Sequence, residues 1–251
     1  SLSEAKIDKK DVIGIGLGLP AILNTNENKA VRIDRIRGWK NIPLKVRIED
    51  ATGLEVFSRN DAHLLGMVET SLLGQGVNNS LYVVHRSGIG MAVFINGKLY
   101  EGSYGNSGYI GHTVVDIHGP QCECGNFGCL ELYCSKRAIK RAYLDLGGSK
   151  ESYEGIVERA LAGEATAFSV LHDAGTVLGY GISNAVKLFD STHVIIGDER
   201  IEEENPFFTA ICDTIHQNTA DYAIQPIEVS LGQLTSSSFG LGGCHFVLDS
   251  F

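Results

Sequence analysis

The sequence predicts an α/β protein with a mixed sheet. Short apolar runs alternate with longer segments in which apolar residues recur at helical spacing, an alternation typical of α/β folds. Asn96-Gly97 lies between two apolar runs and is a strong two-residue hairpin signal, which predicts at least one antiparallel pair of strands. The 251 residues include 30 Gly but only 5 Pro, a balance that favours tight turns over Pro-rich linkers.

Strands are expected where short apolar runs are bounded by turn residues. In chain order, these runs are 12–19, 30–36, 54–57, 80–85, 91–95, 98–100, 194–196 and 227–231, with one more strand near 113–117. Helices are expected where apolar residues follow the helical period. In chain order, these segments are 44–50, 61–72, 130–144, 154–161, 165–189 and 205–219, with a further helix near the end of the chain. Gly179 and Gly181 inside the longest helix predict close helix packing.

Composition and charge exclude several classes of protein. Hydrophobic residues make up 43% and charged residues 20%, which excludes a disordered chain. The 21 basic and 30 acidic side chains give a net charge of −9, a poor match for a nucleic-acid backbone. Contacts with DNA would therefore have to come from another part of the protein. No run of 18 apolar residues predicts a membrane span, and no secretory signal peptide is present, so we expect a cytoplasmic protein.

The strongest chemical signal is a cluster of potential metal ligands. Four of the six cysteines fall within 13 residues, and a histidine precedes them. The expected ligands are His112, Cys122, Cys124 and Cys129. Three thiolates and one imidazole form the ligand set of a closed tetrahedral Zn²⁺ site. His118 is a rival nitrogen ligand and Cys134 a rival sulfur ligand, and the alternative is a set of unrelated groups with buried free thiols. The spacing favours the metal.

Asn60-Asp61 lies between an expected strand and an expected helix. An aspartate at such a position can accept a proton from a sugar hydroxyl as a general base. It can equally cap the helix by accepting hydrogen bonds from free backbone N–H groups. On local evidence alone, the cap is favoured.

Gly88-Ile89-Gly90 separates two expected strands. A turn of this composition can expose backbone N–H groups to a phosphate. The alternative is that the glycines serve only the geometry of the hairpin.

Taken together, these motifs resemble the ROK family, named for repressors, open reading frames and sugar kinases. Gly111-His112, followed by the segment CECGNFGCLE from Cys122 to Glu131, is similar to the family signature in which GH precedes CxCGxxGCxE. Further similar segments are Gly18-Leu19-Pro20, Gly38-Trp39, Pro43-Leu44, Asn60-Asp61-Ala62, Asn96-Gly97, Gly102 to Gly108 and Val194 to Gly197. The resemblance therefore covers nearly the whole chain.

The resemblance implies a two-lobed actin-like, hexokinase-like ATPase fold with ribonuclease H-like lobes. It also implies a zinc-bound loop and a truncated first lobe. On this basis we expect a small α/β lobe over residues 1–78 and a large α/β lobe with the zinc site over residues 79–234. A C-terminal segment, residues 235–251, is expected to return to the small lobe.

The resemblance also implies a sugar site. Asn60, Asp61, His112 and Glu131 match family positions that contact sugar hydroxyls, and Asp61 matches the catalytic base of the kinases. Tyr109 stands where the family usually has a glutamate, which replaces a carboxylate acceptor with a phenol.

This sequence departs from the family pattern in three segments that contact the nucleotide in family kinases. The DxGGT loop that holds ATP phosphates in family kinases is absent from the sequence. The second phosphate loop, usually GTG, has Ile89 in place of the threonine. The late strand, which usually ends in GGG, continues as Gly197-Asp198-Glu199 and adds two carboxylates that would repel phosphate.

The sequence therefore favours the sugar- or sugar-phosphate-sensing portion of a ROK transcriptional regulator. The resemblance to the N-acetylglucosamine-responsive repressors points to an amino sugar. DNA binding would come only through an N-terminal winged helix-turn-helix outside this chain, and we expect a homodimer or homotetramer. The alternative is a ROK sugar kinase that uses ATP and Mg²⁺, with Asp61 as the base. A third reading is a sugar-binding protein with neither role.

Overall fold

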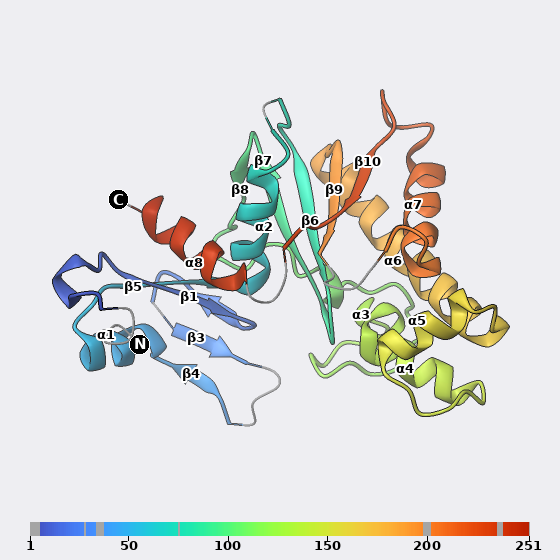
Figure 1. Ribbon diagram of the computed structural model, residues 1–251, viewed down its shortest axis with the longest axis horizontal. Coiled ribbons are helices and arrows are strands. Elements are labelled where there is room, and N and C mark those ends of the chain that lie inside the picture. The colour runs from blue at the N-terminus through green and yellow to red at the C-terminus, as the bar shows by residue number, and fades with distance from the viewer. Residues whose placement is uncertain are drawn as a thin grey trace.

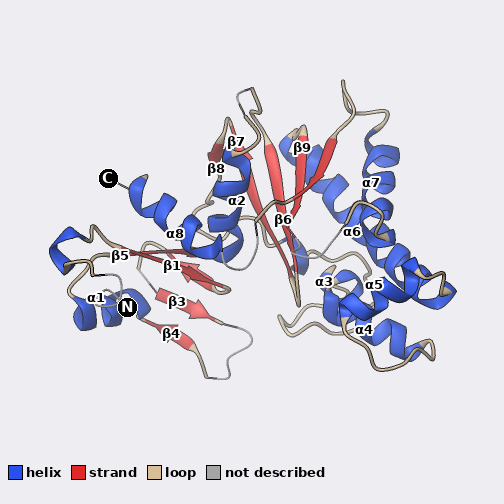
Figure 2. Ribbon diagram, in the orientation of Figure 1, coloured by secondary structure: helices blue, strands red, loops and turns tan. Residues whose placement is uncertain are grey.

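The computed structural model describes residues 6–27, 29–33, 38–74, 76–197, 202–234 and 238–250. The elements form two groups, which lie side by side in Figure 1. One group contains a five-stranded sheet with helices on both faces, and the other contains two small sheets with the C-terminal helix. Figure 2 shows strands and helices in both groups, in agreement with the α/β class that the sequence predicts.

The large sheet has the strand order β10-β9-β6-β7-β8. Its strands are β6 (Ser80–His85), β7 (Ile89–Ile95), β8 (Lys98–Leu99), β9 (His193–Gly197) and β10 (Glu228–Leu231). Strands β6, β9 and β10 run parallel, whereas β7 is antiparallel to both β6 and β8. Asn96 and Gly97 join β7 to β8 with positive φ angles of 53° and 71°, the conformation that this dipeptide favours. The predicted hairpin and mixed sheet are confirmed.

Both faces of the large sheet are buried. Polar and apolar residues therefore do not alternate along β6, whose residues are all buried. Leu81 and Val83 point into a core shared with α6 (Ala165–Phe189), while Tyr82 and Val84 face α2 (Asp61–Ser71). Further helices lie on the α6 side in Figure 1, and they are α3 (Glu131–Cys134), α4 (Lys136–Asp145), α5 (Tyr153–Leu161) and α7 (Pro206–Thr219).

The close packing predicted from the glycines of α6 is confirmed. A Cβ on Gly179 would lie 2.6 Å from the Thr214 Cβ in α7, and a Cβ on Gly181 would lie 2.7 Å from Leu130. Because a side chain at either position would meet its neighbour, the backbone of α6 approaches both elements closely.

The second group has two small sheets. Strands β1 (Ile15–Leu19) and β5 (Val56–Asn60) form a parallel pair. Strands β2 (Ile22–Asn24), β3 (Lys29–Arg32) and β4 (Lys40–Ile42) form an antiparallel sheet with β2 at one edge. The first helical turn, η1 (Lys9–Asp11), and α1 (Leu44–Thr52) belong to the same group. Strands β2 and β4 were not predicted, and residues 34–36 of the strand expected over 30–36 lie outside the described residues.

The C-terminal helix α8 (Phe239–Leu248) packs on β1 and α2, far from its neighbours in sequence. A Cβ on Gly16 would lie 2.4 Å from the Gly243 carbonyl oxygen, so two glycines set the distance between strand and helix. Helix α2 contacts both α8 and the large sheet. The predicted division of the chain into lobes, with boundaries after residues 78 and 234, stays a prediction. Helix α2 contacts elements on both sides of these boundaries.

Two expected elements differ in the structure. Residues 113–117 form no strand, because Val114 makes only an isolated bridge to Cys129 within a glycine-rich loop. The helix expected over 130–144 is interrupted at Ser135, which has an extended backbone and caps α4 by accepting a hydrogen bond from the Ala138 N–H.

Among the residues that the structure describes, no helix combines the length and apolar character needed to cross a membrane.

Candidate functional site

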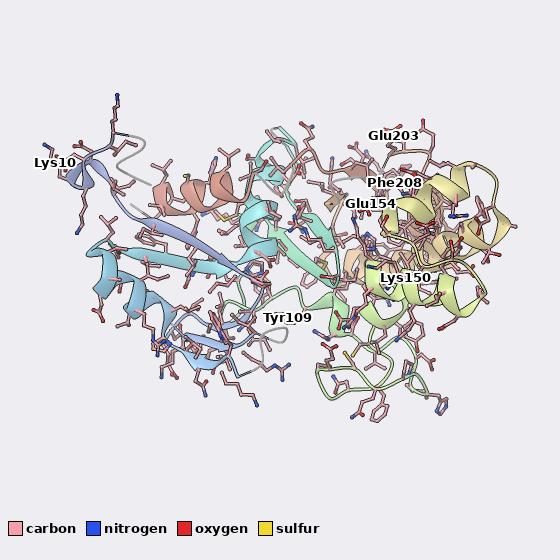
Figure 3. The ribbon with its side chains drawn as sticks, turned by 60° about the horizontal axis from the view of Figure 1, so that its bottom comes forward. Lys10, Tyr109, Lys150, Glu154, Glu203 and Phe208 are labelled. Carbon is pink, nitrogen blue, oxygen red and sulfur yellow. The ribbon has the colours of Figure 1, made fainter. Side chains whose placement is uncertain are left out.

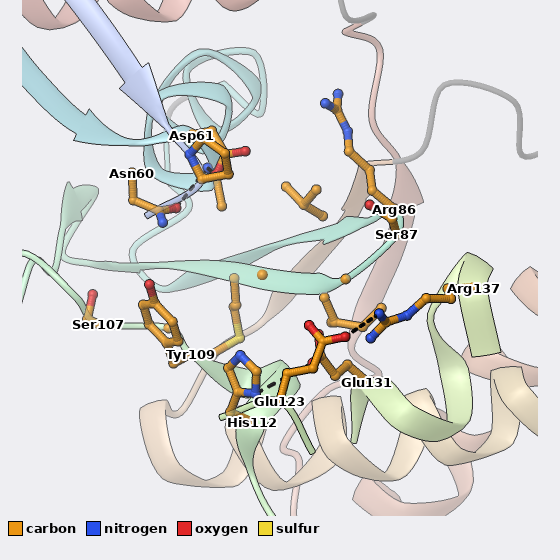
Figure 4. Close-up of a pocket in the computed structure, with 18 residues that line it drawn as sticks. Asn60, Asp61, Arg86, Ser87, Ser107, Tyr109, His112, Glu123, Glu131 and Arg137 are labelled. Carbon is orange, nitrogen blue, oxygen red and sulfur yellow. Dashed lines mark hydrogen bonds and ion pairs between the residues drawn. The ribbon is translucent and has the colours of Figure 1, made fainter. Parts of the chain in front are cut away.

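A cavity of about 340 Å³ opens where the two groups of elements meet. Figure 4 shows its polar side chains, which come from the start of α2, the β6–β7 turn and the segment from Ser107 to Arg137. The five residues predicted to bind a sugar all line this cavity, and they are Asn60, Asp61, Tyr109, His112 and Glu131. Positions up to 71 apart in the sequence are thus brought to one site.

Asn60 ends β5 and caps α2, and Asp61 is the first residue of α2, where unpaired backbone N–H groups are available. Oδ1 of Asn60 and Oδ1 of Asp61 each accept a hydrogen bond from the Ala62 N–H at 2.9 Å. The structure therefore gives the cap to Asn60 and leaves the second carboxylate oxygen of Asp61 for the cavity. Burial raises the pKa of Asp61, although the Ala62 N–H and the Arg86 guanidinium act in the opposite direction.

The opposite wall of the cavity presents His112 and Glu131. His112 ends the short helical turn η2 (Ile110–His112), and Glu131 begins α3. The His112 Nδ1 lies 3.6 Å from the Cys122 Sγ and 3.7 Å from the Glu131 Oε1, and the Cys122 Sγ lies 3.4 Å from the same oxygen. These short distances mean that one loop orients both side chains toward the cavity.

The predicted metal ligands lie together behind this wall. The donor atoms of His112, Cys122, Cys124 and Cys129 all fall within 4.8 Å of one another. The Cys124 and Cys129 sulfurs are 3.6 Å apart, as are the Cys122 sulfur and the His112 Nδ1. A tetrahedral zinc ion, with bonds of about 2.3 Å to sulfur and about 2.0 Å to nitrogen, separates its ligand atoms by about 3.5–3.8 Å. The cluster therefore fits a tetrahedral metal ion.

The rival ligands lie outside the cluster. The Cys134 Sγ is fully buried in α3 and contacts the Leu130 carbonyl at 3.2 Å. His118 lies in the preceding turn, where its N–H donates to the Asp116 carboxylate. Within the cluster, burial and the neighbouring thiols raise the pKa of Cys129 to about 12, and a bound cation would act in the opposite direction by stabilising the thiolate.

The turn expected at Gly88-Ile89-Gly90 is displaced by two residues. Ile89 and Gly90 belong to β7, and the Ile89 side chain is buried in the core of the large sheet. The turn consists instead of residues 86–88, closed by a hydrogen bond from the Arg86 N–H to the Gly88 carbonyl. Gly88, Ile89 and Gly90 nevertheless all line the cavity, so the loss of a hydroxyl at Ile89 near a bound phosphate stays a prediction. Ser87 supplies a hydroxyl in the turn itself.

Sequence reasoning missed the charged side chains that complete the cavity. Arg86, Glu123 and Arg137 line it, and the last two form an ion pair of 2.7 Å. Arg86 directly follows the apolar run of β6, the one signal that could have identified it. Asp198 and Glu199, expected to repel phosphate, lie outside the described residues.

The helix interruption at Ser135 connects the metal cluster to the β6–β7 turn. The Nε2 of the fully buried His85 lies 2.9 Å from the Cys134 carbonyl, and the Lys136 N–H donates to the Arg86 carbonyl at 2.9 Å. A continuous helix would use both of these main-chain groups internally. The break therefore fixes the position of α3, which carries Glu131, relative to the turn.

Tyr109 lies between the two groups of elements, as Figure 3 shows. Its ring is nearly parallel to that of His112, with centroids 5.9 Å apart and an interplanar angle of 20°. The phenol thus forms part of the cavity wall at the position where the family pattern has a carboxylate.

Sequence comparison finds relatives of two kinds. The chain is 30% identical over 242 residues to the xylose repressor of Bacillus subtilis, which covers 96% of this chain and 62% of the relative. It is 30% identical to the N-acetylglucosamine repressor of Escherichia coli, over 80% of this chain and 52% of that protein. It is also 32% identical to a glucokinase of Halalkalibacterium halodurans, over 75% of this chain and 62% of that protein. The chain thus spans about half to two thirds of the length of these curated relatives.

Solved structures confirm the expected hexokinase-like fold. A ROK hexokinase from Thermus thermophilus superposes with a TM-score of 0.83 at 26% identity, covering 99% of this chain and 82% of the hexokinase. A ROK transcriptional regulator, described as a homologue of the Escherichia coli Mlc protein, also gives a TM-score of 0.83 at 25% identity, covering 98% of this chain and 64% of the regulator. A sequence model of the ROK family matches residues 2–247. The chain therefore belongs to the ROK family.

Proposed function

We propose that this chain is the effector-binding portion of a sugar-responsive ROK transcriptional regulator. The observation that carries the proposal is the convergence of Asn60 and Asp61 with His112 and Glu131 on one cavity between the two groups of elements. Carboxylates accept hydrogen bonds from hydroxyl groups, and an amide both donates and accepts. The cavity therefore offers the polar groups that a sugar ring requires.

The effector is a sugar or a sugar phosphate. Asp61 and Glu131 accept hydrogen bonds from ring hydroxyls, while the Asn60 amide nitrogen donates, because its oxygen already accepts from Ala62. A phosphate ester would meet Arg86 and the Ser87 hydroxyl at the β6–β7 turn, which line the same cavity. A ligand held by both walls would bias the relative positions of the two groups of elements.

A structural zinc ion on His112, Cys122, Cys124 and Cys129 completes the site in this proposal. Soft thiolate ligands favour zinc over magnesium or calcium. The ion would hold the loop that presents His112 and Glu131. His112 would serve both functions, because its Nδ1 faces the thiols while the ring lines the cavity.

Repressors and kinases both match most of this chain, since the xylose repressor matches 96% of it and the ROK hexokinase 99%. The regulator role therefore rests on the departures from the kinase pattern, such as Tyr109 in place of the family carboxylate. The net charge of −9 suits a domain that leaves DNA contacts to a separate N-terminal winged helix-turn-helix. Self-association as a dimer or tetramer is part of the same proposal.

A second candidate is an ATP- and Mg²⁺-dependent sugar kinase. Asp61 favours it, because its half-buried carboxylate lies in the cavity and its pKa is raised, as suits a general base that accepts a hydroxyl proton. The replacement at Tyr109 weighs against it, because the family carboxylate at that position is lost.

Ligand binding tests the proposal directly. Calorimetry with D-xylose, D-glucose, N-acetylglucosamine and the phosphate esters of these sugars should reveal binding of at least one compound. We expect Asp61→Ala to weaken it roughly tenfold or more, because a hydrogen bond to a charged group is worth about 1.5–3 kcal/mol. If the wild-type protein binds none of these compounds, the effector assignment is wrong.

A coupled kinase assay on the full-length protein separates the two candidates. We expect no turnover with glucose, N-acetylglucosamine or N-acetylmannosamine. Turnover above about 1 s⁻¹, an ordinary enzymatic rate, would establish the kinase instead.

Metal analysis tests the zinc assignment. The purified protein should contain about one zinc per chain. Cys124→Ser should lower both the metal content and the sugar affinity, because the metal loop carries one wall of the cavity. Cys212→Ser, at a cysteine outside the cluster, is the matched control and should change neither quantity. Metal-free wild-type protein with full sugar affinity would contradict the assignment.

A further inference from the structure

A segment of the large-sheet group reaches across to the small antiparallel sheet. This wall segment, residues 101–109, follows β8 and ends at Tyr109 in the cavity. Strand β2 is the edge strand of the sheet β2-β3-β4, so one row of its main-chain groups faces away from β3. The wall segment covers this row.

The contact imitates the pairing of two strands. The Leu23 N–H donates to the Asn106 Oδ1 at 2.8 Å, and the Asn106 Nδ2 donates to the Leu23 carbonyl. Two residues further along, the Thr25 N–H donates to the Tyr104 carbonyl at 3.4 Å. Thr25 lies in the turn directly after β2, so the wall segment contacts the edge of β2 at Leu23 and the turn that follows it, and Asn106 occupies the place that a neighbouring strand would fill at Leu23.

The other side of the wall segment is fixed to the cavity. The Nε2 of the fully buried His63 in α2 lies 3.0 Å from the Ser107 carbonyl oxygen. Because a carbonyl only accepts, Nε2 carries the proton, and burial lowers the pKa of His63 so that the ring stays neutral. A Cβ on Gly108 would lie 1.9 Å from the Met91 carbonyl oxygen of β7. The segment therefore has little freedom to move independently of Tyr109.

We propose that Asn106 is a positioning residue that couples the ligand-bound wall at Tyr109 to the edge of β2. A sugar that orders Tyr109 and the wall segment also fixes the sheet β2-β3-β4 through the paired hydrogen bonds of Asn106 with Leu23. This coupling rests on the proposed function, because it requires a ligand in the cavity. The proposal assigns the coupling between ligand binding and this sheet to the side chain of Asn106. The family pattern did not identify this residue.

Amide hydrogen exchange of β2–β4 measures the coupling. The probe is whichever of D-xylose, D-glucose and N-acetylglucosamine binds the wild-type protein most tightly. At about 100 times its Kd, a ligand can slow exchange through a linked opening by up to about 100-fold. The readout is Ile33, because its N–H donates to the Trp39 carbonyl at 3.2 Å and does not involve Asn106, and we expect at least about tenfold slowing there. In Asn106→Ala, saturated with the same sugar, the slowing should disappear.

Three variants separate coupling from a purely structural role. If Asn106 only stabilised β2, Asn106→Ala would exchange faster with and without sugar, and the ratio between the two states would persist; that result would overturn the proposal. Asn106→Asp keeps an acceptor for the Leu23 N–H but loses the donor to its carbonyl, so part of the ligand effect should return. Asn218→Ala removes a side-chain hydrogen bond to the Thr214 carbonyl in α7, remote from the cavity, and should preserve the full ratio.

The outcomes also distinguish this proposal from the proposed function. If the wild-type protein binds none of the three sugars or their phosphates, both fail. If it binds one but the exchange ratio survives in Asn106→Ala, only the coupling fails. If Asn106→Ala no longer binds that sugar at any concentration, Asn106 builds the cavity itself and the coupling role is likewise overturned.

Discussion

The two groups of elements are stabilised in different ways. Among the described residues, the main core of the large-sheet group contains 28 buried residues, whereas the core cluster beside β2 and β3 contains four. The small sheets depend on contacts from elsewhere in the chain, namely α8 on β1 and Asn106 on β2. We therefore expect the large-sheet group, called the frame below, to be the more stable of the two. The small-sheet group has a smaller core of its own, so a ligand can change its position relative to the frame more easily.

Loss of core volume in the frame should have the largest effect on stability. Ile182 in α6 is fully buried in the main core, so Ile182→Ala should lower the free energy of unfolding by about 2–5 kcal/mol without changing sugar affinity. Leu188→Ala, in the same helix but at a position 79% exposed, is the control and should cost far less. Denaturant unfolding measures both variants, and equal costs would contradict the picture of a self-contained frame.

Separating α8 from β1 should have the next largest effect. Gly16→Ala places a Cβ 2.4 Å from the Gly243 carbonyl, so we expect a loss of about 1–3 kcal/mol and faster amide exchange in β1 and β5. Gly240→Ala lies in the same helix with nothing within 4 Å, and it should stabilise the protein slightly because alanine favours a helix. If Gly16→Ala left exchange in β1 unchanged, α8 would not be what holds this strand.

Asp61 should show opposite effects on stability and binding. Burial raises its pKa in the folded protein, so the ionised carboxylate opposes folding at neutral pH, and this penalty disappears as the pH falls below the ordinary value of 3.8. Asp61→Asn should therefore raise the melting temperature at neutral pH, and the gain should vanish in acid. The same variant should weaken sugar binding about tenfold, by loss of a charged acceptor. If the affinity were unchanged, Asp61 would not be a ligand of the sugar.

The smallest expected effect is a change of specificity at Tyr109. Tyr109→Glu restores the carboxylate of the family pattern, so binding of D-glucose should improve while the stability of the frame stays the same. Tyr104→Glu makes the same replacement at an exposed position of the wall segment and is the matched control. Calorimetry of both variants decides, and equal affinities for glucose would mean that Tyr109 does not select the sugar.

The sequence predicted the frame better than the attached sheets, for a physical reason. The apolar runs of β6 and α6 are long and buried, so local patterns define them, and the structure reproduces 80–85 and 165–189. Strands β2 and β4 have only three residues each, and β2 is paired at its edge with Asn106, 83 positions away. Local periodicity contains no information about such a partner.

In the candidate site too, features defined by local sequence were predicted, whereas features that depend on long-range contacts were missed. Close spacing and soft ligand chemistry were sufficient to place the metal cluster, whose members converge as predicted. The β6–β7 turn was misplaced because a glycine pattern does not reveal that Ile89 belongs to the core. The break at Ser135 was missed because its cause is the long-range contact between His85 and the Cys134 carbonyl.

The amide of Asn106 also affects how copies of the protein meet one another. An edge strand with open N–H and C=O groups is a template on which a strand of another molecule can add. Asn106 occupies both groups of Leu23 with a side chain that cannot extend the sheet further. Loss of this amide would therefore expose β2 to intermolecular pairing, and the first sign would be aggregation during expression or storage rather than a lower melting temperature.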